Sequence, residues 1–134
     1  MKITVEIQVA APIDKVWQAW NTPKDIMQWN AASDDWHTTR SAVDLQVGGK
    51  YSSRMEAKDG SMGFDFEGSY TRIVHHQSIE SMLGDRALVV EFIAGEHGVT
   101  VRETFDADDS HSIEQQRGGW QAILDRFARH VEST

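Results

Sequence analysis

Cysteine is absent from the 134-residue chain. A chain without cysteine forms no disulfide framework and no thiolate zinc site, and it has no cysteine nucleophile. Long apolar runs are also missing, because none approaches the ~20 residues that a membrane-spanning helix needs. The N-terminal residues alternate between apolar and polar and do not form a signal peptide. These absences predict a cytoplasmic protein with no membrane span.

Basic residues are in the minority, with 13 Lys and Arg against 21 Asp and Glu and a net charge of −8. Nucleic-acid binding needs a basic face for the phosphates, so we expect no DNA or RNA partner. The GxSxG, P-loop, GxGxxG and HExxH patterns are all missing. The six histidines do not show the spacing of a helical metal site. We therefore predict no metal, no cofactor and no catalytic residue.

The first 30 residues predict one strand followed by two short helices. Residues 2–9 alternate between polar and apolar, which is typical of a strand with one buried face. Pro12 suits the first turn of a helix, and apolar residues follow it at helical spacing. We expect Thr22 to cap a second short helix that starts at Pro23.

The middle of the chain predicts strands joined by tight turns. Residues 30–40 show no clear period and are expected to form a loop. From about Val43 onward the pattern is that of strands. Turn signals lie at Asp59-Gly60, Gly84-Asp85 and Gly95–Gly98. Such a succession indicates an antiparallel meander, giving a sheet of about six to seven strands.

The tail predicts one long helix of about 20 residues that starts near Ser110 to Ser112. Its apolar residues fall on one stripe. Gly118 and Gly119 interrupt the helix at a cost of about 1 kcal/mol each relative to alanine. The pair is expected to allow a bend or a close approach, or to leave space beside Trp120.

Together these elements predict a single α+β domain over residues 1–134. A curved antiparallel sheet would wrap around the long C-terminal helix, with two short helices after the first strand. A strongly curved sheet need not fill the space beneath such a helix. Concave apolar space of that kind is where small ligands bind.

Several segments carry a resemblance to a known family: Val9–Trp20, Trp29–Thr38, Asp44–Tyr51, Met55–Tyr70 and Gly118–Glu132. The chain resembles stand-alone members of the family named after the activator of the 90-kDa heat-shock protein ATPase. Members have the helix-grip fold of START-like, Bet v-like domains (the SRPBCC superfamily). The resemblance implies a hydrophobic cavity between the sheet and the long helix. Such cavities hold lipids, sterols, polyketides or other apolar molecules.

Large apolar side chains on the inward faces are predicted to line that cavity, with ordinary core packing as the alternative for each. These residues are Met55, Phe64, Phe66, Tyr70, Phe92, Trp120 and Phe127.

The segment Asp34-Asp35-Trp36-His37 is a second candidate. Trp36 and His37 would lie at the cavity mouth, with His37 as a titrating group that a neighbouring carboxylate orients. The alternative is a solvated loop held in place by Trp36.

Glu103 has the same strand parity as Val101 and Phe105, which predicts that it faces inward. A buried carboxylate is costly unless it is paired, and its pKa should rise if it is desolvated. A ligand or Arg54 could pair with it, or Glu103 could turn out to solvent at the strand end. Gln116, one turn before Trp120, either points into the same space or lies exposed.

Three functions remain open at this stage. The leading hypothesis is non-enzymatic binding of a small apolar or amphipathic ligand. A second is a co-chaperone-like or stress-response module that binds a chaperone or another protein through its acidic surface. A third is an enzyme that acts on a cavity-bound small molecule through His37.

Overall fold

The computed structural model describes residues 1–134. The elements in chain order are β1 (Lys2–Val9), α1 (Ile13–Asn21), α2 (Pro23–Trp29), β2 (Trp36–Val43), β3 (Lys50–Ala57), β4 (Gly63–Val74), β5 (Ser78–Leu83), β6 (Arg86–Gly95), β7 (Gly98–Asp106) and α3 (Ile113–Glu132). The strands form one antiparallel sheet in the order β1-β7-β6-β5-β4-β3-β2. This architecture confirms the expected α+β class, the curved sheet, the two short helices and the long final helix.

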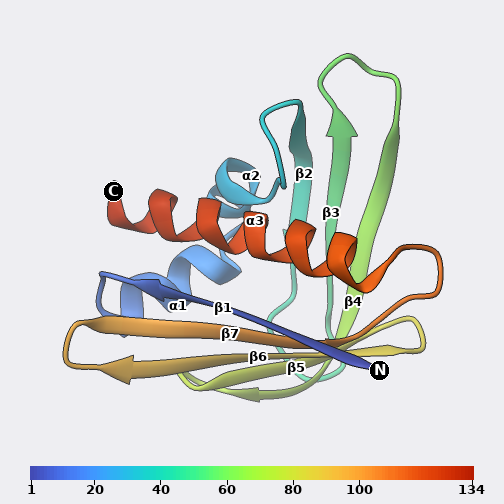
Figure 1. Ribbon diagram of the computed structural model, residues 1–134. Coiled ribbons are helices and arrows are strands. Elements are labelled where there is room, and N and C mark those ends of the chain that lie inside the picture. The colour runs from blue at the N-terminus through green and yellow to red at the C-terminus, as the bar shows by residue number, and fades with distance from the viewer.

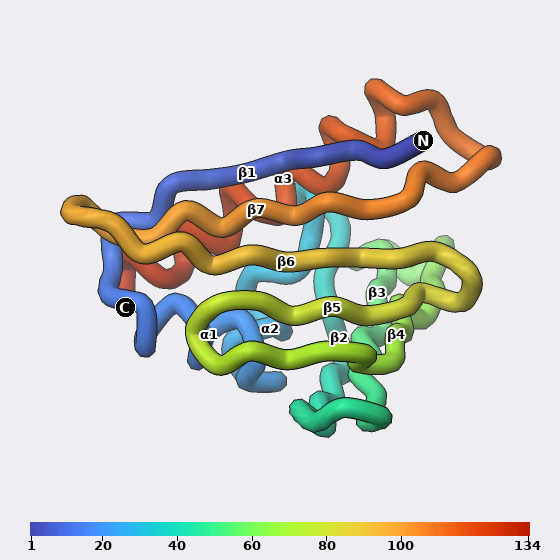
Figure 2. The backbone as a smooth tube through the Cα atoms, turned by 90° about the horizontal axis from the view of Figure 1, so that it is seen from below, coloured from blue at the N-terminus to red at the C-terminus, as the bar shows by residue number.

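The sheet turns a corner. Figure 1 shows β1, β7, β6 and β5 running side by side, while β2, β3 and β4 rise at a steep angle to them. Figure 2 shows the first group from below, with α3 behind it. At the corner lies β4, whose register against β5 shifts between Tyr70 and Arg72. Such a shift bends a strand and increases its twist. The concave side thus faces α3 from two directions.

The prediction of a loop over residues 30–40 is wrong from Trp36 onward, where β2 begins. This strand lies at the edge of the sheet. Its alternation is hidden because its buried residue, Thr38, is polar; the Thr38 hydroxyl donates a hydrogen bond to the Asn30 carbonyl at 2.7 Å. Thr22 does not cap α2 with its side chain either, because its hydroxyl donates to the Gln18 carbonyl at 2.6 Å.

Helix α3 packs tightly against the rest of the fold along its C-terminal half only. Leu124, Phe127 and Val131 are fully buried there. The ring of Phe127 lies about 5 Å from the rings of Trp20 and Trp29, edge to face. In the N-terminal half, by contrast, the apolar side chains on the same stripe, Ile113 and Trp120, are only partly buried. None of the helices is long and apolar enough to cross a membrane.

Tyr51 ties three strands together on the concave face. Its register partner on β4 is Gly68, and a Cβ built at Gly68 would lie 2.4 Å from the Tyr51 ring. The ring therefore lies across the glycine, an arrangement that pins strand register. Beyond Gly68, the Tyr51 hydroxyl shares a hydrogen bond of 2.9 Å with the Ser81 hydroxyl on β5.

The two glycines before β3, Gly48 and Gly49, join the preceding loop to β4. The Gly48 N–H donates to the Tyr70 carbonyl, and the Tyr70 N–H donates to the Gly49 carbonyl, both at 2.9 Å. Gly48 has a φ of 86°, which favours glycine. An added Cβ at Gly49 would overlap the Asp44 carbonyl oxygen. The loop before β3 is thereby fixed to β4 beside Tyr51.

We expect Gly68→Ala to lower the free energy of unfolding by about 1–3 kcal/mol, because the new methyl group would displace the Tyr51 ring. Gly118→Ala is the matched control. A Cβ there meets no atom within 4 Å, so removing a helical glycine should raise stability by up to about 1 kcal/mol. Urea denaturation measures both. Equal stability of Gly68→Ala and the unaltered protein would contradict the stacking of Tyr51 on Gly68.

Candidate functional site

A cavity of about 530 Å³ lies between the concave face of the sheet and the N-terminal half of α3. This volume falls within the range of about 300–1,000 Å³ that is typical of small-molecule sites. Its walls come from the end of α1, from α2, from the strands β2 to β7 and from α3. The large apolar side chains of the wall are Trp20, Ile26, Trp29, Trp36, Val43, Met55, Phe64, Phe66, Ile79, Leu88, Val90, Trp120 and Ile123, beside the two tyrosines Tyr51 and Tyr70.

The space exists because the N-terminal half of α3 offers little bulk to the sheet. Gly119 lines the cavity, and a Cβ added to it would meet no atom within 4 Å. The Trp120 ring does not fill the gap, because it lies flat against Phe105 of β7 with centroids 3.9 Å apart and planes 15° apart. Phe66 meets Trp120 edge to face at 6.0 Å. The result is a space walled by aromatic rings.

Glu103 of β7 lines this cavity and is 5% exposed. Its cross-strand neighbours are Val5 on β1 and Val90 on β6. No hydrogen-bond donor and no basic group pairs with its carboxyl, and burial raises its pKa to about 8. Its inward position is the one that strand parity predicted.

Pairing of Glu103 with Arg54, one of the alternatives that the sequence left open, does not occur. Arg54 bonds Glu56 through its Nε at 3.0 Å and lies 3.5 Å from a carboxylate oxygen of Asp65. It does not line the cavity. Alternation along β3 turns it away from the face that carries Tyr51.

Hydroxyl groups supply the remaining polar floor of the cavity. Burial raises the pKa of Tyr51 to about 12, the hydrogen bond with Ser81 opposes that rise, and the nearby charge of Glu103 adds to it. Tyr51 and Glu103 are thus close enough to influence one another. Ser41 also lines the cavity, and its buried hydroxyl has no hydrogen-bond partner.

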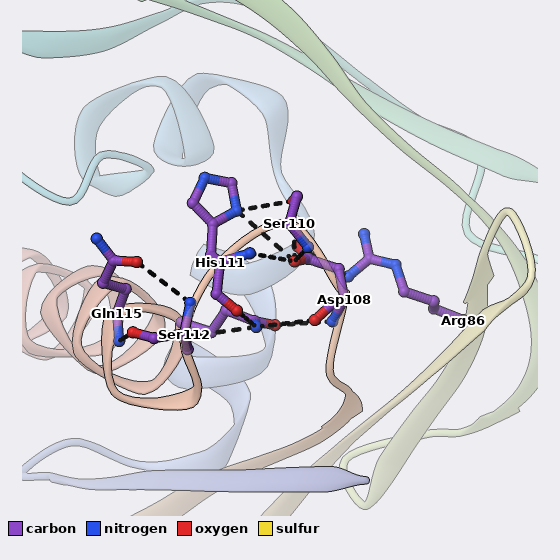
Figure 3. A network of polar contacts seen from close by, with 7 residues as sticks. Arg86, Asp108, Ser110, His111, Ser112 and Gln115 are labelled. Atoms are coloured by element: carbon purple, nitrogen blue, oxygen red, sulfur yellow. Dashed lines mark hydrogen bonds and ion pairs between the residues drawn. The ribbon is translucent and has the colours of Figure 1, made fainter.

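The loop between β7 and α3 contributes Asp108 and His111 to the cavity wall and so forms one rim of it. Figure 3 shows the polar contacts within this loop. Asp108 lies 3.7 Å from the Arg86 guanidinium and 3.6 Å from the His111 ring. The Ser112 hydroxyl accepts from the Gln115 N–H at 3.1 Å, and the Gln115 side chain accepts from the Ser112 N–H at 3.2 Å. This capping box starts α3 at the position that the sequence predicted.

Gln116 is buried at the same rim, but its side chain is already bonded to the loop. Its carboxamide oxygen accepts from the Asp108 N–H at 2.9 Å. Its NH₂ group donates to the carbonyls of Asp108, at 3.1 Å, and His111, at 2.9 Å. Gln116 therefore holds the rim in place rather than presenting a free polar group.

Most of the residues predicted for ligand binding do lie on the cavity wall: Trp36, Met55, Phe64, Phe66, Tyr70, Glu103, Gln116 and Trp120. His37, Phe92 and Phe127 do not line it. His37 follows Trp36 on β2, so it points to the opposite face. Phe92 packs edge to face against Trp17 and Trp20, and Phe127 belongs to the packed half of α3.

The two carboxylates before Trp36 do not orient His37. Asp34 is 95% exposed and accepts a hydrogen bond of 2.7 Å from Arg126 of α3. That hydrogen bond and the charge of Arg126 lower the pKa of Asp34. Asp35 accepts a hydrogen bond from the Ser33 hydroxyl. Asp34 and Asp35 therefore lie on the surface just before β2, and Asp34 is tied to α3 by Arg126.

Sequence reasoning missed Tyr51, Ser81, Ser41 and Arg86 as wall residues. The sequence did hold a signal for Tyr51: this aromatic residue follows a pair of glycines, and the next strand carries a further glycine, Gly68, which the structure places opposite it. The serines carried no signal: the bond of Ser81 with Tyr51 depends on how the non-consecutive strands β3 and β5 are placed, and the Ser41 hydroxyl has no partner.

In comparison with known proteins, the family model and a similar solved structure both describe AHSA1-like proteins. A family model described as "Activator of Hsp90 ATPase homolog 1-like protein" matches residues 10–132. The solution structure of an AHSA1-like protein from Aeromonas hydrophila is 50% identical, with a TM-score of 0.93 over 99% of this chain and 93% of that one. A protein from Cytophaga hutchinsonii is 42% identical, with a TM-score of 0.84 over 98% and 92%.

A Chromobacterium violaceum protein is 22% identical, with a TM-score of 0.88 over 98% of each chain, and shows the same fold. The comparison with curated proteins gives no match.

The burial of Glu103 predicts a pH-dependent stability. The folded protein keeps a proton on Glu103 up to about pH 8, whereas the unfolded chain loses it near 4.5. Between these values the folded state binds more protons, so it loses stability as the pH rises. The slope is about 1.4 kcal/mol per pH unit.

We expect Glu103→Gln to remove this slope. Between about pH 4.5 and pH 8 the free energy of unfolding of the variant should therefore rise relative to that of the unaltered protein. Urea denaturation at a series of pH values measures the difference. Glu67→Gln, at an exposed position of β4, is the control and should show no such gain. A difference for Glu103→Gln that does not change with pH would contradict a protonated, buried Glu103.

Proposed function

The chain belongs to the family of Activator of Hsp90 ATPase homolog 1-like proteins, and from this premise we propose that it binds a small apolar or amphipathic molecule. The ligand would lie in the cavity between the sheet and the N-terminal half of α3. The protein would hold this molecule without transforming it.

The observation that carries the proposal is the cavity itself, with an unpaired carboxyl on its wall. Protein interiors are close-packed, and a void of about 530 Å³ forfeits the contacts that its lining would otherwise make. A buried carboxyl without a partner adds a second cost. A ligand with an apolar body and a polar group would relieve both costs at once.

The rim supports the same function, because it is built to stay in place. Gln116 and the capping box fix the start of α3 and the preceding loop with hydrogen bonds. The opposite half of α3 is anchored by the buried aromatic cluster around Phe127. A helix held at both ends over an unfilled space is a preorganised site, which reduces the entropic cost of binding.

The cavity can be filled from within to test this function. Gly119 lines the cavity and Gly118 is exposed, and an added Cβ meets no atom within 4 Å at either position. We expect Gly119→Leu to place its side chain in the cavity and to weaken binding of the uncharged dye N-phenylnaphthylamine at least about tenfold. Gly118→Leu is the matched control and should bind the dye like the unaltered protein.

Dye fluorescence measures the binding, and circular dichroism confirms that both variants fold. Equal dye affinity of the two leucine variants would place the binding outside the cavity and overturn the proposal.

A further inference from the structure

We propose that the ligand of this cavity is an organic amine bound as its cation, with its apolar body under α3 and its charged nitrogen against the carboxylate of Glu103. This inference rests on the proposed binding function and specifies the chemistry of its ligand.

The ionisable groups in the buried part of the cavity are all acids. The titratable side chains on its wall are Tyr51, Tyr70, Arg86, Glu103, Asp108 and His111. Arg86 and His111 both approach Asp108 at the rim and are partly exposed there. Facing Glu103 from the neighbouring strands are Val5 and Val90. The buried part of the site therefore holds an acid and no base.

No group of the protein donates a hydrogen bond to the Glu103 carboxyl. The other buried polar groups nearby are bonded to one another or to the rim: Tyr51 shares its hydrogen bond with Ser81, and Gln116 is bonded to Asp108 and His111. A protonated primary amine carries three N–H donors and no acceptor. One of them would reach Glu103, and the oxygens of Tyr51 and Ser81 would accept the others. A charge-assisted hydrogen bond of this kind is about twice as strong as a neutral one.

Aromatic rings on the cavity wall that Glu103 shares favour a cation further. Tyr51 and Tyr70 lie with ring centroids 5.0 Å apart, and Phe66 lies 6.3 Å from Tyr51 and 6.0 Å from Trp120. The faces of such rings attract ammonium groups, most strongly where water is excluded. A ligand anion would instead meet Glu103 and the ring faces, because the two bases at the rim, Arg86 and His111, already lie against Asp108.

The proton balance of binding follows from the burial of Glu103. In the free protein at pH 7 the carboxyl carries its proton, since its pKa is about 8. When the ammonium group binds, Glu103 releases that proton to solvent and the ligand keeps its own. Deprotonation one pH unit below the pKa costs a factor of about ten in affinity, which a buried ion pair with good geometry outweighs.

Three probes with one shared body test the inference: phenylbutylamine, phenylbutanol and phenylbutanoate. Isothermal titration calorimetry of the full chain at pH 7 should show the amine binding at least about tenfold tighter than the alcohol. The carboxylate should bind more weakly than the alcohol. Repeating the amine titration in phosphate and in Tris should show release of about one proton per amine bound.

Glu103→Gln keeps the shape and hydrogen-bonding capacity of the side chain and removes its charge. We expect this variant to lose the preference for the amine and the proton release, and to keep its affinity for phenylbutanol. Glu67→Gln, on the exposed face of β4, is the control for a change in net charge and should behave like the unaltered protein.

The outcomes separate the two proposals. If phenylbutanol binds as tightly as phenylbutylamine, and Glu103→Gln changes the affinity for neither probe, the amine inference is overturned and the proposed binding function stands. A preference for phenylbutanoate would overturn it equally. If the unaltered protein binds none of the three probes, and N-phenylnaphthylamine does not bind either, both proposals fail.

Discussion

The site depends on one constraint: α3 packs tightly along half of its length only. Its C-terminal half buries Leu124, Phe127 and Val131 completely, and this packing provides the apolar burial that holds the helix on the sheet. The sheet, meanwhile, turns a corner beneath the other half. Because a helix is straight and the sheet is not, the two surfaces separate toward the start of α3. Gly119 and the flat-lying Trp120 leave that separation open.

The floor of the cavity is rigid for a reason that is independent of the helix. Tyr51 crosses Gly68 and reaches Ser81, so a single side chain links β3, β4 and β5 at the corner of the sheet. The hydroxyls of Tyr51 and Ser81 are hydrogen-bonded to each other even without a ligand. Glu103, by contrast, has no partner, and an unpaired buried acid opposes stability. Costs of this kind are expected at functional sites, where a local rule is broken and offset elsewhere.

Sequence periodicity was a good guide to which face a residue occupies. It placed Glu103, Met55 and Trp120 inward, and the structure agrees. It was a poor guide to position along that face. Phe127 shares the apolar stripe of Trp120, yet it lies at the packed end of α3, because a stripe does not reveal where the sheet curves away. Edge strand β2 was missed since Thr38, its buried residue, is polar. The contact of Tyr51 with Ser81 depends on register across three strands, which local patterns do not encode.

Register also explains why Glu103 stays unpaired. The basic residue that the sequence suggested as its partner was Arg54, three positions along the chain from Tyr51. Turning Arg54 toward Glu103 would need β3 to slip by one residue, and such a slip moves every side chain of a strand to the opposite face. Tyr51 would then leave Gly68, and its link to Ser81 would be lost. The register that builds the floor of the cavity therefore also keeps Arg54, with its partners Glu56 and Asp65, outside it. The acidic character of the cavity is thus a consequence of the way the sheet is held together.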